Sequence, residues 1–117
     1  MVTRFLPGAT TVARGEPDGT LTVYDHDTSQ IHWSQQVHRG SITALEWSPD
    51  GAWLASGGGD GLVYLFQTTS GLCSCSFEHG RAVQRLEWSP DSRQLCITSG
   101  HRIHVLRITP LNDTSRS

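Results

Sequence analysis

His38, Ser56 and Asp60 are the residues of this sequence whose types could perform a reaction together. A serine nucleophile, a histidine base and a carboxylate that orients the base form the usual arrangement for nucleophilic acyl transfer. Residue types alone do not establish that arrangement, because the three side chains must also lie within hydrogen-bonding reach of one another. The sequence therefore raises an enzyme hypothesis that depends on the elements that carry these residues.

Two other patterns could bind a ligand, and each lacks something that the ligand needs. Cys73 and Cys75 would lie on one face of a strand, but zinc takes about four ligands. His79 is the nearby candidate in the sequence, and Cys96 is expected on a different strand. The glycine-rich run at 57–61 lacks the Lys-Ser/Thr ending of a phosphate loop and precedes a strand rather than a helix. We therefore expect no bound metal or cofactor.

These residues belong to a stretch that predicts short antiparallel strands separated by tight turns. Alternating apolar residues and β-branched or aromatic residues favour strands at 42–48, 53–57 and 62–67. The sequence SPDG at 48–51 suits a β-turn, and the glycines at 57–61 suit a tight reversal. A three-stranded sheet cannot bury both of its faces alone, so other parts of the chain must cover it.

The same pattern recurs along the chain. The six residues LEWSPD occur at 45–50 and again at 86–91, a spacing of about 41 residues. The strand at 62–66 has counterparts that begin at Thr20 and at Arg102. Repeats of about 40 residues with four strands each are typical of β-propeller blades.

The second repeat resembles the WD-repeat family. His38 is followed by SPDG, then by ASGGGDG at 55–61, and then by a hydrophobic strand that ends in an aromatic residue. The Trp-Asp pair that usually ends this strand is replaced here by Phe66-Gln67. The resemblance covers roughly residues 10–108. It implies an all-β fold, a partial WD-repeat β-propeller with slightly under three four-stranded blades of antiparallel sheet.

The repeats divide the chain into expected structural units. We expect a propeller segment over residues 1–109 made of three blades, at about 9–37, 38–78 and 79–109. Residues 1–8 would be the remnant of an inner strand that Pro7-Gly8 breaks early, and residues 110–117 would form a polar tail. Closed propellers usually have four to eight blades. Further blades from the same or another chain would therefore be needed to close the ring.

The resemblance gives a structural role to the residues that suggested an enzyme. The structural tetrad of the family would join His38, Ser56 and Asp60 to the aromatic residue Phe66. Because Phe66 has no indole N–H, that network could be at most partial. In the third repeat Gly100 stands where the turn aspartate should be, so we expect the third blade to lack the network. The tetrad explains these residues without any reaction, and we therefore expect no enzyme.

Aromatic and arginine side chains are the most frequent anchors of protein interfaces. Trp47 and Trp88 occupy equivalent places at the ends of inner strands, which predicts that they lie in the core between blades. The other two tryptophans, on an outer strand and at the start of a second strand, are surface candidates. With the arginines near the turns they make up a predicted partner-binding rim of Trp33, Arg39, Trp53, Arg81 and Arg102.

Composition excludes several classes of function. All nine basic residues are arginine, eleven residues are acidic, and the net charge is −2. Without a basic stripe, nucleic acid is not an expected partner. No apolar run reaches about 18 residues, so we expect no membrane span. Three cysteines, an odd number, do not suggest a disulfide framework, so the expected location is the cytoplasm, the nucleus or both.

The resemblance also implies a function. WD-repeat propellers are mainly rigid platforms whose loops and central face bind proteins or peptides. The sequence LASGGGDGLVYLF at 54–66, together with AVQRLEWSP at 82–90, is similar to the C-terminal blades of Fizzy-type co-activators of the anaphase-promoting complex. Those proteins recognise degron peptides in substrates and present them to a ubiquitin ligase. The implied partners are therefore degron-bearing substrates and subunits of that complex, and the implied role is that of a non-enzymatic adaptor and activator.

Two alternatives stay open beside the adaptor. A generic WD-repeat scaffold in another intracellular assembly would contain the same residues, and a propeller enzyme or small-ligand binder is the third hypothesis. The N-terminal ligase-binding motifs and the C-terminal Ile-Arg ending of Fizzy-type proteins are not among these residues. Their absence would remove activator function from this segment even if the resemblance holds.

Overall fold

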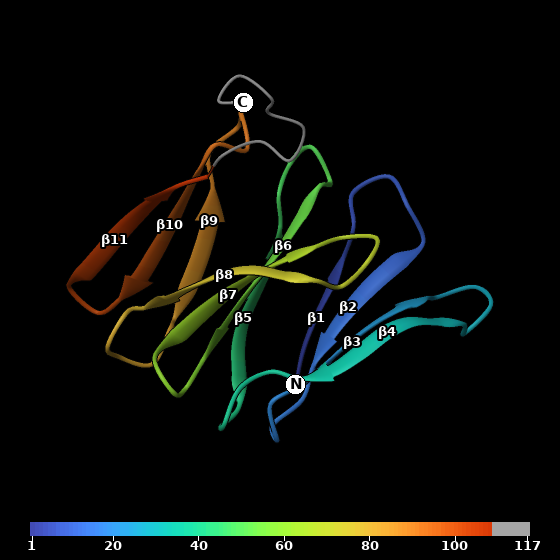
Figure 1. Cartoon of the computed structure of the whole chain (residues 1–117), viewed down its shortest axis with the longest axis horizontal. Coiled ribbons are helices and arrows are strands. Elements are labelled where there is room, and N and C mark those ends of the chain that lie inside the picture. Colours follow the sequence, from blue (N-terminus) through green and yellow to red (C-terminus); the bar gives the residue numbers. More distant parts are fainter. Residues whose placement is uncertain (109–117) are drawn as a thin grey trace.

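The computed structural model describes residues 1–108, which form eleven antiparallel strands in three sheets (Figure 1). The first sheet contains β1 (Val2–Phe5), β2 (Thr11–Gly15), β3 (Thr20–Asp25) and β4 (Ile31–Gln36). The second contains β5 (Ile42–Trp47), β6 (Trp53–Gly58), β7 (Leu62–Gln67) and β8 (Cys73–Glu78). The third contains β9 (Arg85–Trp88), β10 (Gln94–Ser99) and β11 (Arg102–Arg107). The predicted all-β fold is confirmed, and the third sheet has one strand fewer than the others.

The first sheet begins earlier than the sequence predicted. Pro7-Gly8 does not end this sheet but lies in the turn between its first two strands, where Gly8 has a φ of 75°. β1 pairs with β2 in the register Val2↔Gly15 to Phe5↔Val12. The first blade therefore starts at Val2 instead of residue 9. The expected polar tail at 110–117 lies outside the described residues.

The turn between the first two strands of a sheet is built in the same way in the second and third sheets. The Asp50 carboxylate accepts hydrogen bonds from the Ser48 hydroxyl at 2.6 Å and from the Ala52 N–H at 3.0 Å. In the third sheet Asp91 accepts equivalent bonds from Ser89 and Arg93. The repeated sequence motif is therefore a local hydrogen-bonded turn that sets the register of the strands on either side.

The sheets pack face to face, with the inner strands β1, β5 and β9 next to one another (Figure 1). The Trp47 indole N–H donates to the Arg4 carbonyl at 3.0 Å, and the Trp88 indole N–H donates to the Glu46 carbonyl at 3.1 Å. Both indoles are buried in the two apolar clusters that separate the sheets. The predicted core position of these two tryptophans is confirmed.

Glycine allows close contact between consecutive sheets at two places. A Cβ atom on Gly15 would lie 2.5 Å from the Ile42 side chain, and one on Gly57 would lie 2.5 Å from the Val83 side chain. No other residue type leaves that space, so the glycines fix the distance between consecutive sheets.

Within residues 1–108, no helix is long and apolar enough to cross a membrane.

Candidate functional site

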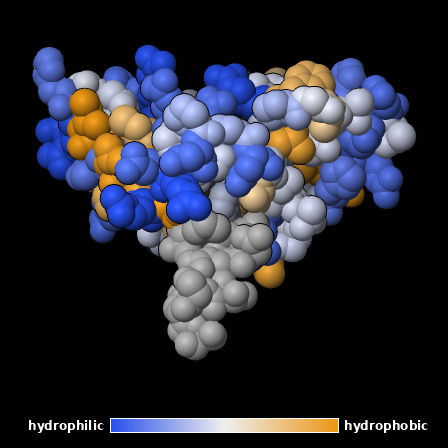
Figure 2. Space-filling view, turned by 90° about the horizontal axis from the view of Figure 1, so that it is seen from above, coloured by the Kyte–Doolittle hydropathy of each residue, from blue (hydrophilic) through white to orange (hydrophobic). Residues whose placement is uncertain are grey.

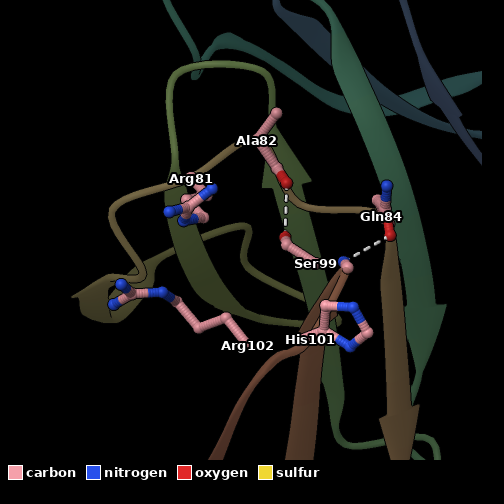
Figure 3. A pocket seen from close by; sticks show the side chains of 7 residues that line it. Arg81, Ala82, Gln84, Ser99, His101 and Arg102 are labelled. Carbon is pink, nitrogen blue, oxygen red and sulfur yellow. Dashed lines mark hydrogen bonds between the residues drawn. The ribbon is translucent and has the colours of Figure 1, made fainter.

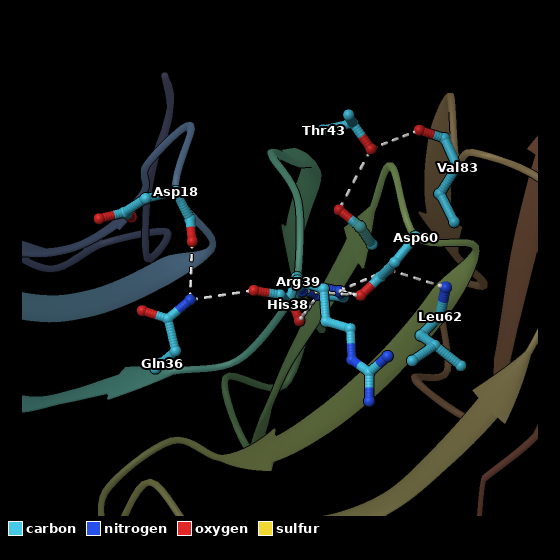
Figure 4. A network of polar contacts seen from close by, with 10 residues as sticks. Asp18, Gln36, His38, Arg39, Thr43, Asp60, Leu62 and Val83 are labelled. Atoms are coloured by element: carbon cyan, nitrogen blue, oxygen red, sulfur yellow. Dashed lines mark hydrogen bonds and ion pairs between the residues drawn. The ribbon is translucent and has the colours of Figure 1, made fainter.

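The structure brings three of the four predicted tetrad residues into one hydrogen-bonded network (Figure 4). His38 Nε2 lies 2.9 Å from the Ser56 hydroxyl oxygen, and His38 Nδ1 lies 3.0 Å and 3.2 Å from the two carboxylate oxygens of Asp60. An ionised carboxylate only accepts hydrogen bonds, so the Nδ1–H donates to Asp60 and Nε2 accepts from Ser56. We call these three residues the His38 network.

The network joins a linker to the sheet that follows it. His38 lies in the link from β4 to β5, Ser56 lies on β6, and Asp60 lies in the turn between β6 and β7. The Asp60 carboxylate also accepts the backbone N–H groups of Arg39 and Leu62, each at 3.1 Å. One carboxylate therefore fixes the link, the turn and the histidine together.

A glutamine that the sequence analysis did not select holds the same link from the other side. The Gln36 side-chain amide donates to the Asp18 carbonyl at 2.7 Å and to the His38 carbonyl at 3.0 Å. Asp18 lies in the equivalent turn of the first sheet, so the link is tied to both neighbouring sheets (Figure 4). No residue pattern marks this glutamine in the sequence, because its partners are backbone carbonyls.

The environment of Asp60 keeps its carboxylate charged. Partial burial raises the pKa, but the N–H groups of Leu62 and Arg39 and the His38 imidazole lower it further than burial raises it. The net result is a pKa below the ordinary value for aspartate. The charged form is therefore the one that the folded network stabilises.

Phe66 does not take part in the polar network. Its side chain is buried, and its ring centroid lies 5.4 Å from that of Trp33 and 6.3 Å from that of Tyr64. Tyr64, which the sequence analysis did not select, packs edge-to-face against the His38 ring with centroids 5.1 Å apart. Phe66 is thus a core residue, and Tyr64 is the aromatic side chain that covers the histidine.

The His38 network has the order of a catalytic triad but not its accessibility. Ser56 has no exposed surface, and His38 is 2% exposed. A nucleophile must meet the reacting carbon of a substrate, and a buried hydroxyl cannot do so without local unfolding. The arrangement stabilises the fold, and its geometry offers no place for a substrate.

The third sheet has a different pair of residues at the equivalent place. Ser56 pairs with Tyr64 across β6 and β7, whereas Ile97 pairs with His104 across β10 and β11. Ile97 therefore replaces the serine, and His104 replaces the tyrosine. His79, the counterpart of His38, has its Nδ1 2.7 Å from Nδ1 of His104.

Without a serine and an aspartate beside it, His79 lacks a hydrogen-bond partner within residues 1–108 for one of its ring nitrogens. Its Nε2 is buried and has no hydrogen-bond partner among the described residues. Burial lowers the pKa of His79, and the neighbouring His104 ring and the positive charges of Arg102 and Arg81 lower it further. The third sheet therefore contains a buried neutral imidazole where the second sheet contains a complete network.

Two of the five predicted rim residues are not at the surface. Trp33 is 9% exposed, and its indole N–H donates to the Thr68 carbonyl of the neighbouring sheet at 3.1 Å. Trp53 is 6% exposed and belongs to the apolar cluster between the second and third sheets. The prediction that these tryptophans form a binding surface is wrong, because the adjacent sheet covers each of them.

The other three predicted rim residues are exposed and share one end of the sheets. Arg39 and Arg81 lie in the links that lead into β5 and β9, and Arg102 begins β11. A Cβ atom on Gly61, beside Asp60, would lie 3.1 Å from the backbone nitrogen of Arg81, which places the two links near the same turn. Their guanidinium groups form no salt bridge with the carboxylates of residues 1–108. We call Arg39, Arg81 and Arg102 the arginine rim.

A cavity of about 660 Å³ opens at the arginine rim, beside the turn between β10 and β11 (Figure 3). The Gly100 N–H donates to the Gln84 side chain at 2.7 Å, and the Ser99 hydroxyl donates to the Ala82 carbonyl. The cavity is lined by Arg81, Ala82, Gln84, Ser99, Gly100, His101 and Arg102. The histidine and the glutamine in this lining were not selected from the sequence, since no spacing rule marks them.

The cysteines do not gather into a metal site. Cys73 and Cys75 are exposed on β8, and Cys96 is partly buried on β10. Partial desolvation raises the pKa of both Cys73 and Cys75, although neither residue is buried, and this favours the unreactive thiol form. In the part of the chain that the structure describes, no three His, Cys, Asp or Glu side chains are grouped as metal ligands.

Comparison with known proteins agrees with this architecture. Residues 29–67 match the WD40 family, described as "WD domain, G-beta repeat". The Cps50 (Swd1) β-propeller domain of Myceliophteria thermophila superposes with a TM-score of 0.84, at 24% identity over 94% of this chain and 36% of that domain. Residues 29–67 therefore contain a WD repeat, and the three sheets have the fold of β-propeller blades. The predicted fold, a partial WD-repeat propeller, is thereby confirmed, and each sheet is one blade.

The similarity to individual WD-repeat proteins is partial. Periodic tryptophan protein 2 homolog of Mus musculus is 40% identical over 55 residues, which are 47% of this chain and 6% of that protein. Meiotic fizzy-related protein 2 of Schizosaccharomyces pombe is 36% identical over 63 residues, which are 51% of this chain and 12% of that protein. A chain in a crystal structure of the mitotic checkpoint complex has a TM-score of 0.77 at 24% identity, over 86% of this chain and 32% of that one. The chain thus spans a small part of the curated relatives that it matches.

Proposed function

We propose that this chain is a non-enzymatic platform that binds other proteins through the end of its blades that carries the arginine rim. The proposal rests on one observation: a hydrogen-bonded link supports exposed arginine side chains that have no salt-bridge partner within residues 1–108. The His38 network fixes the link that contains Arg39, while the guanidinium groups of Arg39, Arg81 and Arg102 form no salt bridge within residues 1–108. Arginine on a rigid support loses little conformational freedom when it binds, which favours its use at interfaces.

The narrower form of the proposal is a substrate-recognition adaptor of the anaphase-promoting complex. The 36% identity with meiotic fizzy-related protein 2 over 63 residues supports it. Such an adaptor would bind degron-bearing substrates and subunits of the complex, and it would act in the cytoplasm or the nucleus. The generic scaffold is the alternative, because relatives in other WD-repeat proteins have comparable identity over similar lengths.

Affinity capture from cells of the source organism tests both forms. The bait is the full chain, and the matched bait has Arg39→Gln, Arg81→Gln and Arg102→Gln together. We expect a defined set of proteins on the first bait that is lost from the second. Subunits of the anaphase-promoting complex in that set would support the adaptor, and a different assembly would replace the adaptor with the generic scaffold.

The same experiment can contradict the proposal. If both baits retain the same proteins, the arginine rim is not the binding surface. If neither bait retains more than an unrelated β-propeller used as a control, the chain is not a protein-binding platform. The three arginine side chains are exposed, so the substitutions leave the core unchanged.

A further inference from the structure

The second blade contains a carboxylate at a place where the third blade has none. In the second blade the Asp60 carboxylate accepts hydrogen bonds from the Arg39 N–H, the Leu62 N–H and His38 Nδ1. The last ladder pair of β6 and β7 is Gly57↔Val63, so the five residues 58–62 connect the paired positions and leave room for that side chain. In the second blade, therefore, one carboxylate in this turn is bound by three hydrogen-bond donors.

The turn of the third blade is shorter and lacks the aspartate. Ser99 pairs directly with Arg102, so only Gly100 and His101 form the reversal. Gly100 has a φ of 57°, which suits a two-residue hairpin turn. The shorter turn contains His101 and is followed directly by Arg102 at the start of β11, so basic residues and no acid lie at this reversal.

The space beside this turn is open and positively charged. The cavity of about 660 Å³ is lined by both Arg81 and Arg102, and Figure 3 shows their guanidinium groups on the same side of the turn. Two other polar groups of the lining are bonded within the chain, because Gln84 accepts the Gly100 N–H and Ser99 donates to the Ala82 carbonyl, whereas the His101 ring forms no hydrogen bond within residues 1–108. The groups without a partner of opposite charge are therefore the two arginines.

The effect of this charge on a neighbour supports the same interpretation. The pKa of His79 is lowered by burial, by the neighbouring His104 ring and by the positive charges of Arg102 and Arg81. In the second blade the equivalent histidine lies 3.0 Å from a carboxylate oxygen instead. The end of the third blade thus has an excess of positive charge that no carboxylate in residues 1–108 balances through a salt bridge.

We propose that the cavity between Arg81 and Arg102 binds a carboxylate of an acidic protein segment. Two guanidinium groups around one cavity can bind an aspartate or glutamate side chain through paired charge-assisted hydrogen bonds. This inference rests on the proposed protein-binding function and adds the chemistry of the partner. Nucleic acid is a poorer occupant, because the whole chain has a net charge of −2 and contains no basic stripe.

Binding of a synthetic peptide by the full chain tests the inference. The probe is a blocked, fluorescein-labelled peptide in which Glu-Asp-Glu is flanked by Gly-Ser on both sides, and fluorescence anisotropy measures its Kd. The matched peptide contains Gln-Asn-Gln instead. We expect saturable binding of the acidic peptide and none of the neutral one. Arg81→Gln and Arg102→Gln should each weaken binding by about tenfold, the usual scale for one charge-assisted contact.

Two further variants make the result specific. Arg107→Gln changes an exposed arginine at the other end of β11 and should leave the Kd unchanged. His101→Asp supplies a carboxylate from the turn itself, so it should abolish peptide binding and raise the Tm. His101 does not have a positive φ, so the substitution adds no backbone strain there.

Several results would overturn the carboxylate site. These are no binding of the acidic peptide, equal binding of the neutral peptide, or equal weakening by Arg107→Gln. The proposed function would stand in each case if affinity capture still depends on the arginine rim. If the acidic peptide does not bind and affinity capture does not depend on the arginine rim, the proposed platform function is rejected as well.

Discussion

Asp60 is the residue on which the His38 network depends. Its carboxylate accepts two backbone N–H groups and one imidazole N–H, and His38 has almost no access to water. A donor left without an acceptor in a buried place loses its hydrogen bond and cannot regain one from solvent. The energetic role of the network is therefore concentrated in one side chain.

Asp60→Ala should lower the free energy of unfolding by about 1–3 kcal/mol, because it leaves the buried imidazole N–H unpaired. Urea unfolding followed by tryptophan fluorescence measures the change. Asp27→Ala is the matched control, since the Asp27 side chain is exposed and accepts no hydrogen bond within the described residues. An unchanged free energy of unfolding in Asp60→Ala would show that the network does not stabilise the fold.

The network also gives stability a pH dependence with a defined sign. The folded pKa of Asp60 lies below its ordinary value of 3.8, so its charged form is favoured by folding. The contribution of Asp60 is therefore fully present above about pH 4 to 5 and is lost as the pH falls through the lower folded value. Asp60→Asn should show a smaller loss of stability between pH 5 and about pH 3 than the natural chain, measured by urea unfolding at each pH. An equal loss would show that other carboxylates cause the acid sensitivity.

At the scale of the element, the second and third blades differ in what a histidine contributes. His38 joins a serine and an aspartate, whereas His79 has one nitrogen facing His104 and the other without a partner. A buried polar group stabilises the fold only when its hydrogen-bond partners are present. His38 and His79 therefore contribute differently to the free energy of unfolding.

His38→Leu should therefore cost about 2 kcal/mol more than His79→Leu in the free energy of unfolding. The first substitution leaves Ser56 and Asp60 without their partner, and the second removes an imidazole that is already incompletely bonded. The two variants are controls for each other, because both replace a buried histidine at the same position of a blade. Equal costs would contradict the difference between the blades.

Many of the strands and turns could be predicted from the sequence, and the predictions that were wrong have physical reasons. The repeated LEWSPD turn and the period of about 40 residues predicted the blades, because turn chemistry and strand alternation are local properties. The first strand was interpreted as broken at Pro7-Gly8, although these residues form a hairpin turn. Burial of Trp33 could not be predicted, because the Thr68 carbonyl and Gly71 that contact it belong to the next blade.

The candidate site was predicted in part for the same reason. His38, Ser56 and Asp60 follow from a family motif, and the three exposed arginines follow from their place near the turns. The pairing of His79 with His104 was missed, because it joins a link to a strand 25 residues further along the chain and no local pattern marks such a contact.

At the scale of the whole molecule, the outer face of the third blade is apolar. Ile103 is 61% exposed and Val105 is 60% exposed, and alternation along β11 places both on one face. Figure 2 shows hydrophobic surface at the end of the molecule where β11 lies. In a propeller this kind of face packs against another blade, and an uncovered sheet of this kind tends to associate.

Val105→Lys should therefore reduce concentration-dependent association of the chain in sedimentation velocity experiments. Leu72→Lys is the control, because Leu72 is equally exposed at 63% but lies in the link between β7 and β8. We expect the sedimentation coefficient of the first variant to change less with concentration than that of the second. A matching concentration dependence would show that the face of β11 does not drive association.

The central claim is that a rigid set of blades presents its arginine-bearing end to protein partners. Hydrogen exchange of the full chain, with and without a partner recovered by affinity capture, tests this claim most directly. We expect slower exchange on binding in the links and turn that carry the arginine rim, at residues 38–41, 79–84 and 99–102. Slower exchange confined to the turns at the opposite end, at residues 49–52 and 90–93, would contradict the account.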